Sequence, residues 1–128
     1  MAETQKKIFL VEDDDFLSSM LVKKFEEHGV VVERFSTGRS VLEALEKSVP
    51  DLVLLDLYLP ETNGFEVLDS IRKDEKIQGL FVVVISNTAQ AKDKTYVEER
   101  GAQFITKALV TPEEIAQRVD EALAKIAA

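Results

Sequence analysis

The sequence contains no cysteine, which excludes disulfide bonds and thiolate metal sites. Histidine is almost as scarce, because His28 is the only one, and we expect it at the surface near the end of a helix, without a functional role. No run of lysine or arginine is longer than a pair, and the formal net charge at pH 7 is −8. This charge balance argues against nucleic acid or an anionic membrane as the main partner.

Long apolar runs are also missing, and none approaches the length that is needed to cross a membrane. The first residues, MAETQKK, lack the apolar stretch of a signal peptide. With 128 residues, 45% of them hydrophobic, the chain has the size of one domain and can bury roughly two thirds of its surface. We therefore expect a soluble, cytoplasmic protein in which residues 1–128 form a single domain.

Strand-like and helix-like segments alternate along the chain. Five segments are rich in β-branched and aliphatic residues, and three are almost continuously apolar, as expected for parallel strands covered on both faces. The expected strands are 7–12, 30–35, 52–57, 80–86 and 102–106. Helical periodicity predicts helices around 16–25, 41–45 and 65–71, and a weakly amphipathic one around 89–100. A last helix is expected after the capping box TPEE at 111–114. Short connections between these units imply right-handed crossovers and an α/β fold with helices on both faces of a parallel sheet.

Polar side chains stand at the carboxyl ends of the expected strands. The first strand ends in Glu12 and Asp13, the third contains Asp56, and the fourth and fifth lead to Ser86 and Lys107. Ligands of an open parallel sheet bind outside the carboxyl ends of its strands, so we expect these side chains to converge. Clustered carboxylates raise one another's pKa unless a cation offsets them, and an oxygen-rich site without thiols or imidazoles suits Mg²⁺.

A metal, an ammonium group and a hydroxyl around one carboxylate form a site for phosphoryl transfer, with that carboxylate as the nucleophile. Each residue alone also has a plainer interpretation. The acids after the first strand could cap a helix, Asp56 could cap a loop, Ser86 could be an N-cap, and Lys107 could be solvated. Their position at four strand ends in the right order favours one shared site.

The sequence resembles the receiver domains of response regulators, which are the phosphoacceptor half of two-component signalling. The resemblance covers essentially the whole chain. It rests on VEDD for the acidic pair, LLDLYLP for the phosphoacceptor strand, NG for the turn after it, VVVIS for the hydroxyl strand and FITK for the aromatic-and-lysine strand. It implies a flavodoxin-like, doubly wound sheet of five parallel strands in the order 2-1-3-4-5, with five helices.

The resemblance also implies roles for the acidic residues. Asp56 would receive a phosphoryl group from a phosphohistidine of a sensor histidine kinase or a histidine phosphotransfer protein. Asp13 and Asp56 would bind Mg²⁺ directly, with the main-chain carbonyl of Tyr58 as a third protein ligand, and Glu12 would act mainly through metal-bound water. Such a chain catalyses only its own phosphorylation and dephosphorylation, so we do not expect an enzyme.

Further roles follow for the later strands. Ser86 would donate a hydrogen bond to one phosphate oxygen, Lys107 would pair with another, and Phe104 matches an aromatic position that turns inward on activation. Two residues depart from the family pattern. Ala108 stands where proline usually follows the lysine, so either a costly cis bond is kept or the loop differs. Asn87 stands where a small residue usually follows the hydroxyl, and its amide could crowd the phosphoryl oxygens or hydrogen-bond to them.

Two other functions compete with this interpretation. The first is a pseudo-receiver, a protein-binding module with the same fold that is not phosphorylated. The second is an aspartyl-nucleophile phosphohydrolase of the haloacid-dehalogenase type, which needs a second Asp where this chain has Tyr58, and usually a cap domain. A self-contained transcription factor is not expected, because no length remains for a DNA-binding domain. We expect the chain to dock on another protein, or to be part of a longer one.

Overall fold

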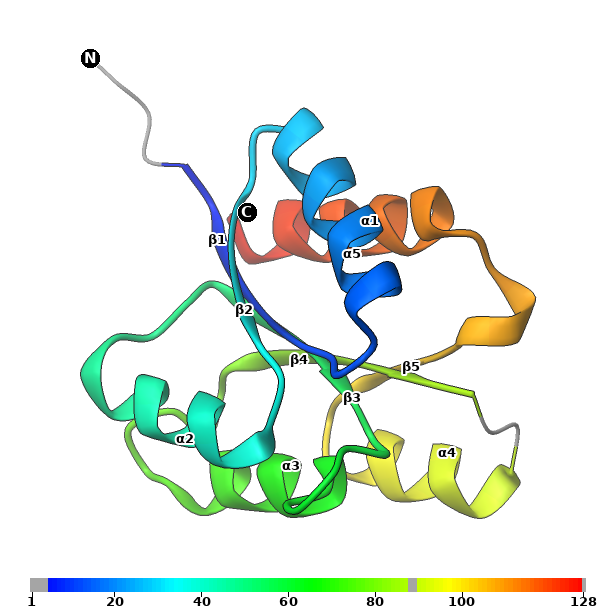
Figure 1. Cartoon of the computed structure of the whole chain (residues 1–128). Helices are drawn as coiled ribbons and strands as arrows, with labels where there is room; N and C mark the ends of the chain where they lie inside the picture. Colours follow the sequence, from blue (N-terminus) through cyan, green and yellow to red (C-terminus); the bar gives the residue numbers. More distant parts are fainter. Residues whose placement is uncertain (1–4, 88–89, 128) are drawn as a thin grey trace.

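The structure, a computed structural model, describes residues 5–87 and 90–127. Strands and helices alternate along this part of the chain (Figure 1). The strands are β1 Lys7–Val11, β2 Val31–Phe35, β3 Leu52–Asp56, β4 Phe81–Ser86 and β5 Gln103–Thr106. The helices are α1 Asp15–Glu27, α2 Gly38–Lys47, α3 Gly64–Lys73, α4 Ala91–Glu99, the short 3-10 helix η1 Lys107–Leu109, and α5 Pro112–Ala127. No helix among the described residues is both long and apolar enough to span a membrane.

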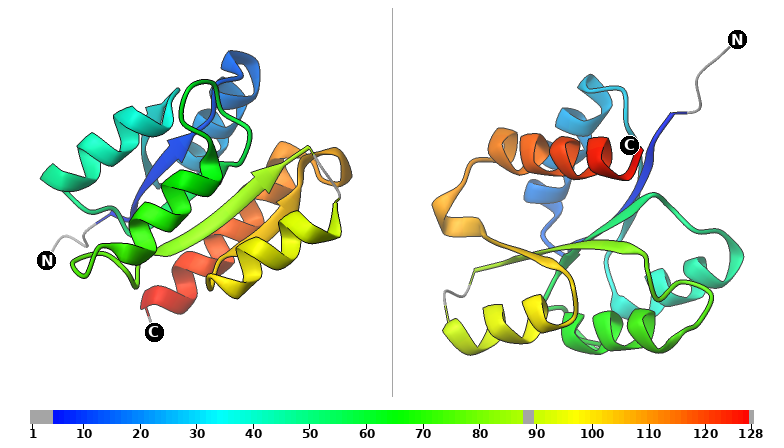
Figure 2. Two further views of the ribbon diagram at one scale, coloured as in Figure 1. Left: turned by 90° about the horizontal axis from the view of Figure 1, so that it is seen from below. Right: turned by 180° about the vertical axis from the view of Figure 1, so that it is seen from behind.

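All five strands run parallel in one sheet, in the order β2-β1-β3-β4-β5. Helices α1 and α5 cover one face, and α2, α3 and α4 cover the other (Figures 1 and 2). This arrangement confirms the predicted flavodoxin-like, doubly wound α/β fold with five helices. Strand order reverses between β1 and β3, so the loops after these two strands turn to opposite faces and leave a place for a ligand between them.

The core lies on both faces of the sheet, which explains the continuous apolar runs. In β1, Phe9 and Val11 belong to the core under α2, α3 and α4, while Ile8 and Leu10 belong to the core under α1 and α5. Every residue of β3 is buried. The edge strand β2 is half exposed instead. Central strands therefore have no polar face, and polar residues can appear only at their ends.

Two helices begin with the capping residues that the sequence predicted, and the bounds of some elements shift slightly. The side chain of Asp14 caps α1 by accepting from the N–H of Leu17 over 3.1 Å. For this acid, the plainer interpretation as a helix cap is therefore confirmed. Thr111 and Glu114 exchange the two hydrogen bonds of a capping box, as predicted. Strand β3 ends at Asp56, one residue earlier than expected. The expected start of the fourth helix, at Ala89, lies outside the described residues.

His28 ends α1 at the surface, as the sequence predicted. Its ring pairs with Asp120 and with Glu113, 3.4 Å away, both on α5. The hydrogen bond with Asp120 raises the pKa of His28 above its usual value. These contacts join the two helices that cover the same face of the sheet.

Candidate functional site

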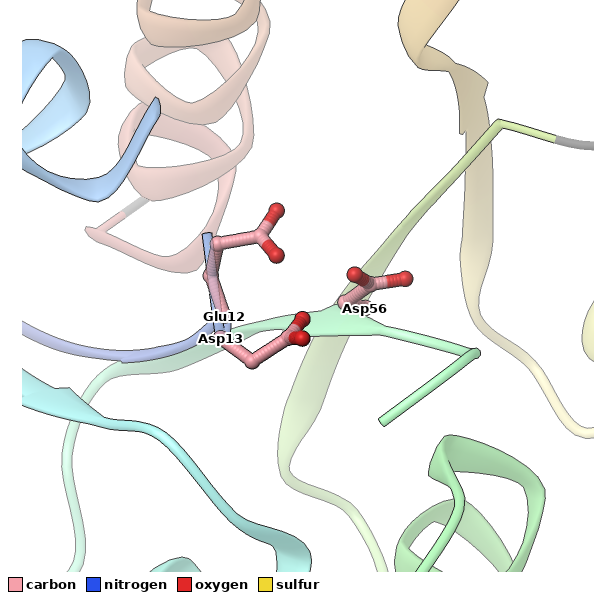
Figure 3. A group of neighbouring side chains, drawn as sticks. All are labelled: Glu12, Asp13 and Asp56. Atoms are coloured by element: carbon pink, nitrogen blue, oxygen red, sulfur yellow. The ribbon is translucent and has the colours of Figure 1, made fainter. Parts of the chain in front are cut away.

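Three carboxylates meet at the carboxyl end of the sheet. Glu12 and Asp13 directly follow β1, and Asp56 ends β3, the neighbouring strand. One carboxylate oxygen of each lies within 4.8 Å of the others (Figure 3). Glu12 is fully buried and Asp56 is nearly so, whereas Asp13 is exposed. The structure therefore brings together the three acids that the sequence placed at one edge.

The ammonium group of Lys107 lies between two of these acids. Its Nζ is 2.5 Å from Oε1 of Glu12 and 2.9 Å from Oδ2 of Asp56. Lys107 follows β5, so this contact joins the last strand of the sheet to the first and third. One ammonium group cannot neutralise three carboxylates, and an excess of negative charge remains that a further cation would offset.

Burial changes the ionisation of the site. It raises the pKa of the Glu12 carboxyl from 4.5 to about 7; the hydrogen bond from Lys107 opposes this increase, and the neighbouring Asp56 adds to it. Burial alone would lower the pKa of Lys107, but its hydrogen bonds to Glu12 and Asp56 outweigh this effect and raise it. Lys107 therefore stays charged at neutral pH, while the Glu12 carboxyl titrates close to neutrality.

This shift predicts a pH-dependent stability for the metal-free protein. The folded chain binds the Glu12 proton more tightly than the unfolded chain does, so its contribution to stability is present below pH 4.5 and is lost as the pH rises to about 7. Urea unfolding in a chelator should show this decline, and the decline should be shallower in Glu12→Gln. The His28 imidazole, whose pKa is also raised, makes its own contribution to the pH dependence of stability. A His28→Gln variant is therefore the control for that contribution. An identical slope in wild type and Glu12→Gln would contradict the assignment.

Main-chain contacts fix the loop that contains the acids. The carbonyl oxygen of Glu12 accepts from Nε and Nη2 of Arg34 at 3.2 and 3.0 Å, and from the Ser18 hydroxyl at 3.3 Å. Arg34 also forms an ion pair with Asp15 at 2.8 Å. No sequence pattern predicts this role, because a charged residue on a half-exposed edge strand is ordinary. Arg34 anchors the acidic loop from β2.

Tyr58 contacts the site through its main chain and α4 through its side chain. Its N–H donates to Oδ1 of Asp56 over 3.1 Å, and its hydroxyl donates to Oδ2 of Asp93 over 2.6 Å. This second hydrogen bond raises the pKa of Tyr58, so the phenol stays protonated. A cavity of about 260 Å³ opens beside the acids, and it is lined by Glu12, Asp13, Asp14, Asp56, Tyr58, Asn87 and Lys107.

The other predicted residues lie around this cluster. Ser86 ends β4, is fully buried, and is in register with Thr106. Phe104, on β5, is half-buried against the core under α2, α3 and α4. Asn87 is exposed and lines the cavity, so its amide is available to a ligand there. The 3-10 helix η1 begins at Lys107, and no peptide bond in the described residues is cis, so the costly cis bond before Ala108 is not kept.

Comparisons with known proteins by sequence and by structure both find response regulators. The sequence profile of the response regulator receiver domain matches residues 8–120. The polar-differentiation response regulator DivK of Brucella ovis is 27% identical over 108 residues, which cover 84% of this chain and 88% of DivK. A solved receiver domain protein (CheY-like) from Methanospirillum hungatei has a TM-score of 0.86 at 25% identity, with 96% of this chain and 97% of that chain covered. The phosphorylated cyanobacterial phytochrome response regulator RcpA has a TM-score of 0.81 at 29% identity, with 93% and 91% covered.

The matched region includes every strand end at the site, from the acids after β1 to the lysine after β5. Fold, strand order and sequence profile therefore agree. The chain belongs to the response regulator receiver domain family.

Proposed function

We propose that this receiver domain is a phosphoacceptor. Asp56 takes a phosphoryl group from a phosphohistidine of a sensor histidine kinase or a histidine phosphotransfer protein, and the phosphorylated chain then signals to a partner protein. The main support is the convergence of Glu12, Asp13 and Lys107 on the carboxylate of Asp56. A relative with the same fold, RcpA, is described as phosphorylated.

The donor set fits Mg²⁺. Mg²⁺ prefers a few carboxylate and carbonyl oxygens together with water. One oxygen of each of the three carboxylates lies within 4.8 Å of the others, so acidic oxygens are gathered where such an ion would be held. Asp13 and Asp56 would hold the ion together with the carbonyl of Tyr58, and Glu12 would contact its water. The ion would offset negative charge between the acceptor carboxylate and the phosphoryl oxygens.

The chemistry needs few groups from the chain. A carboxylate oxygen of Asp56 forms a bond to phosphorus while the phosphorus–nitrogen bond of the phosphohistidine breaks, and the imidazole leaves with the electron pair. The product is a mixed anhydride on Asp56. Lys107, charged and 2.9 Å from Oδ2 of Asp56, pairs with a phosphoryl oxygen, and the hydroxyl of Ser86 donates to another. The chain turns over no external substrate, so it is not an enzyme in the usual sense.

The proposed output is a population shift. The hydroxyl of Ser86 can donate to the phosphoryl group only when that group is present, and such a differential contact is what a shift requires. Phe104 is half-buried beside this strand and can turn further inward. Helix α4 is the element that is most easily displaced, because Asp93 and Val97 are its only buried residues. We further propose that residues 1–128 form one receiver domain that acts in the cytoplasm, without nucleic acid or membrane as a partner.

The direct test of this function uses the purified chain, a small phosphodonor and Mg²⁺. Intact-mass measurement should show one added phosphoryl group per chain, and a chelator should prevent its addition. A chain that binds partner proteins but takes up no phosphoryl group would instead be a pseudo-receiver.

Magnesium should stabilise the fold by mass action, since it binds the folded site and not the unfolded chain. Asp13→Ala should reduce this effect, because it removes one of the proposed ligands. The same change should raise the stability of the metal-free protein, since a repelling carboxylate is gone. Thermal unfolding with and without millimolar Mg²⁺ measures both effects, and Glu43→Ala, which removes an exposed acid of α2, is the control. A melting temperature that does not respond to Mg²⁺ would count against the metal site.

A further inference from the structure

Asp93 is an acidic residue of α4 that matches no sequence motif. It lies in the first turn of α4 and is only 5% exposed. A buried carboxylate is costly unless it accepts hydrogen bonds, and the hydroxyl of Tyr58 supplies one over 2.6 Å. The two residues are 35 positions apart, so this bond joins α4 to the loop after β3.

Packing holds the Tyr58 ring only weakly. The residue is 52% exposed, and the ring of Phe65 meets its ring edge-on at a centroid distance of 6.0 Å. Its main-chain N–H lies against the acceptor carboxylate, 3.1 Å from Oδ1 of Asp56. A contact between α4 and the Tyr58 hydroxyl therefore acts on a residue whose main chain is part of the site.

We propose that Asp93 is a positioning residue for the site: by accepting from the hydroxyl of Tyr58, it fixes the loop whose main chain contacts Asp56. The inference rests on the proposed function, in which the carbonyl of Tyr58 is a ligand of Mg²⁺. A ligand that is already ordered loses less conformational entropy on binding, so the affinity for the ion is higher. Coupling is reciprocal, so ion binding in turn fixes α4 against this loop.

Helix α4 offers a matched control in a second pair of the same chemistry. The hydroxyl of Tyr96 donates to Oδ2 of Asp69, and Nε of Arg100 donates to Oδ1 of the same carboxylate over 2.7 Å. Asp69 lies on α3, so this pair fastens α4 to α3 and not to the loop after β3. Loss of Asp69 should loosen α4 without releasing the hydroxyl of Tyr58.

The experiment is isothermal titration calorimetry of the whole chain, first with Mg²⁺ chloride alone and then with Mg²⁺ and beryllofluoride, a mimic of the phosphoryl group. Asp93→Ala and Tyr58→Phe should each weaken Mg²⁺ binding about three- to tenfold, and the double variant should lose no more than either alone. Asp93→Asn keeps an oxygen acceptor and should bind nearly as well as wild type. Asp69→Ala should unfold more easily but keep its Mg²⁺ affinity within about twofold.

Unchanged Mg²⁺ affinity in both Asp93→Ala and Tyr58→Phe would overturn the inference. So would an equal loss in Asp69→Ala, because the effect would then come from the general docking of α4. Amide exchange of the metal-free proteins separates the inference from the proposed function. If wild type binds neither Mg²⁺ nor the mimic, the proposed function fails. In that case, faster exchange across residues 57–63 in Asp93→Ala would still support the positioning role, and unchanged exchange would overturn it.

Discussion

Asp56→Asn is expected to abolish the uptake of a phosphoryl group from a small phosphodonor in the presence of Mg²⁺. An amide oxygen is a poor nucleophile, and the substitution also removes the negative charge that a metal ion would share. Intact-mass measurement and peptide mapping give the readout. The expected result is complete loss. Among the described residues, only Asp56 and Glu12 are buried carboxylates at a strand end in contact with Lys107, and we propose that Glu12 acts through water.

The fold should survive this substitution. Asparagine has nearly the same shape as aspartate, and its side-chain oxygen can still accept from the N–H of Tyr58. Asp51→Asn is the control, since Asp51 lies at the opposite end of β3 and its carboxylate accepts from the N–H of Lys7 over 2.8 Å. That variant should be phosphorylated like wild type. Labelling of Asp56→Asn at the wild-type level, for example on Asp13, would show that the acceptor is assigned to the wrong residue.

The sheet was predictable because a parallel strand that is covered on both faces leaves a continuous apolar run in the sequence. That rule identified β1, β3 and β4, and their carboxyl ends then gave the positions of Asp56 and Ser86. One bound of each strand shifted by one residue, since hydrogen bonding and not hydrophobicity decides where a strand ends. Thus Asp56 ends β3, whereas the apolar pattern continues through Leu57.

Contacts between distant side chains were not predictable from periodicity. The pattern gives the face of an element on which a residue lies, but not the direction in which an exposed phenol reaches. The hydrogen bond between Tyr58 and Asp93 depends on the height of α4 above the loop, which no local sequence specifies. The anchoring of the acidic loop by Arg34 is of the same kind. The weak amphipathicity expected of the fourth helix was informative, since α4 is attached to its neighbours largely through polar side chains such as Tyr96 and Arg100.

Gly64→Ala is expected to destabilise the fold by about 3 kcal/mol. Gly64 opens α3, and its N–H donates to the carbonyl of Leu57 over 2.7 Å. A Cβ atom at this position would lie 2.3 Å from the main-chain oxygen of Asp56 and 2.6 Å from Cα of Leu57. Both contacts are with main-chain atoms, which no side-chain rotation can relieve. The loop must therefore move, and Asp56 must move with it.

The measurement is urea unfolding of Gly64→Ala beside Gly79→Ala. Gly79, in the loop after α3, has nothing within 4 Å of the added Cβ and no left-handed backbone, so alanine should be neutral there or stabilising by up to about 1 kcal/mol. Both variants make the same chemical change, and only the surroundings of the new methyl group differ. Gly64→Ala should also weaken Mg²⁺ binding even where the protein remains folded, because the displaced atoms belong to the residue that would hold the ion. If Gly64→Ala were as stable as Gly79→Ala, the close approach of α3 to the end of β3 would be wrong, and so would the position assigned to Asp56.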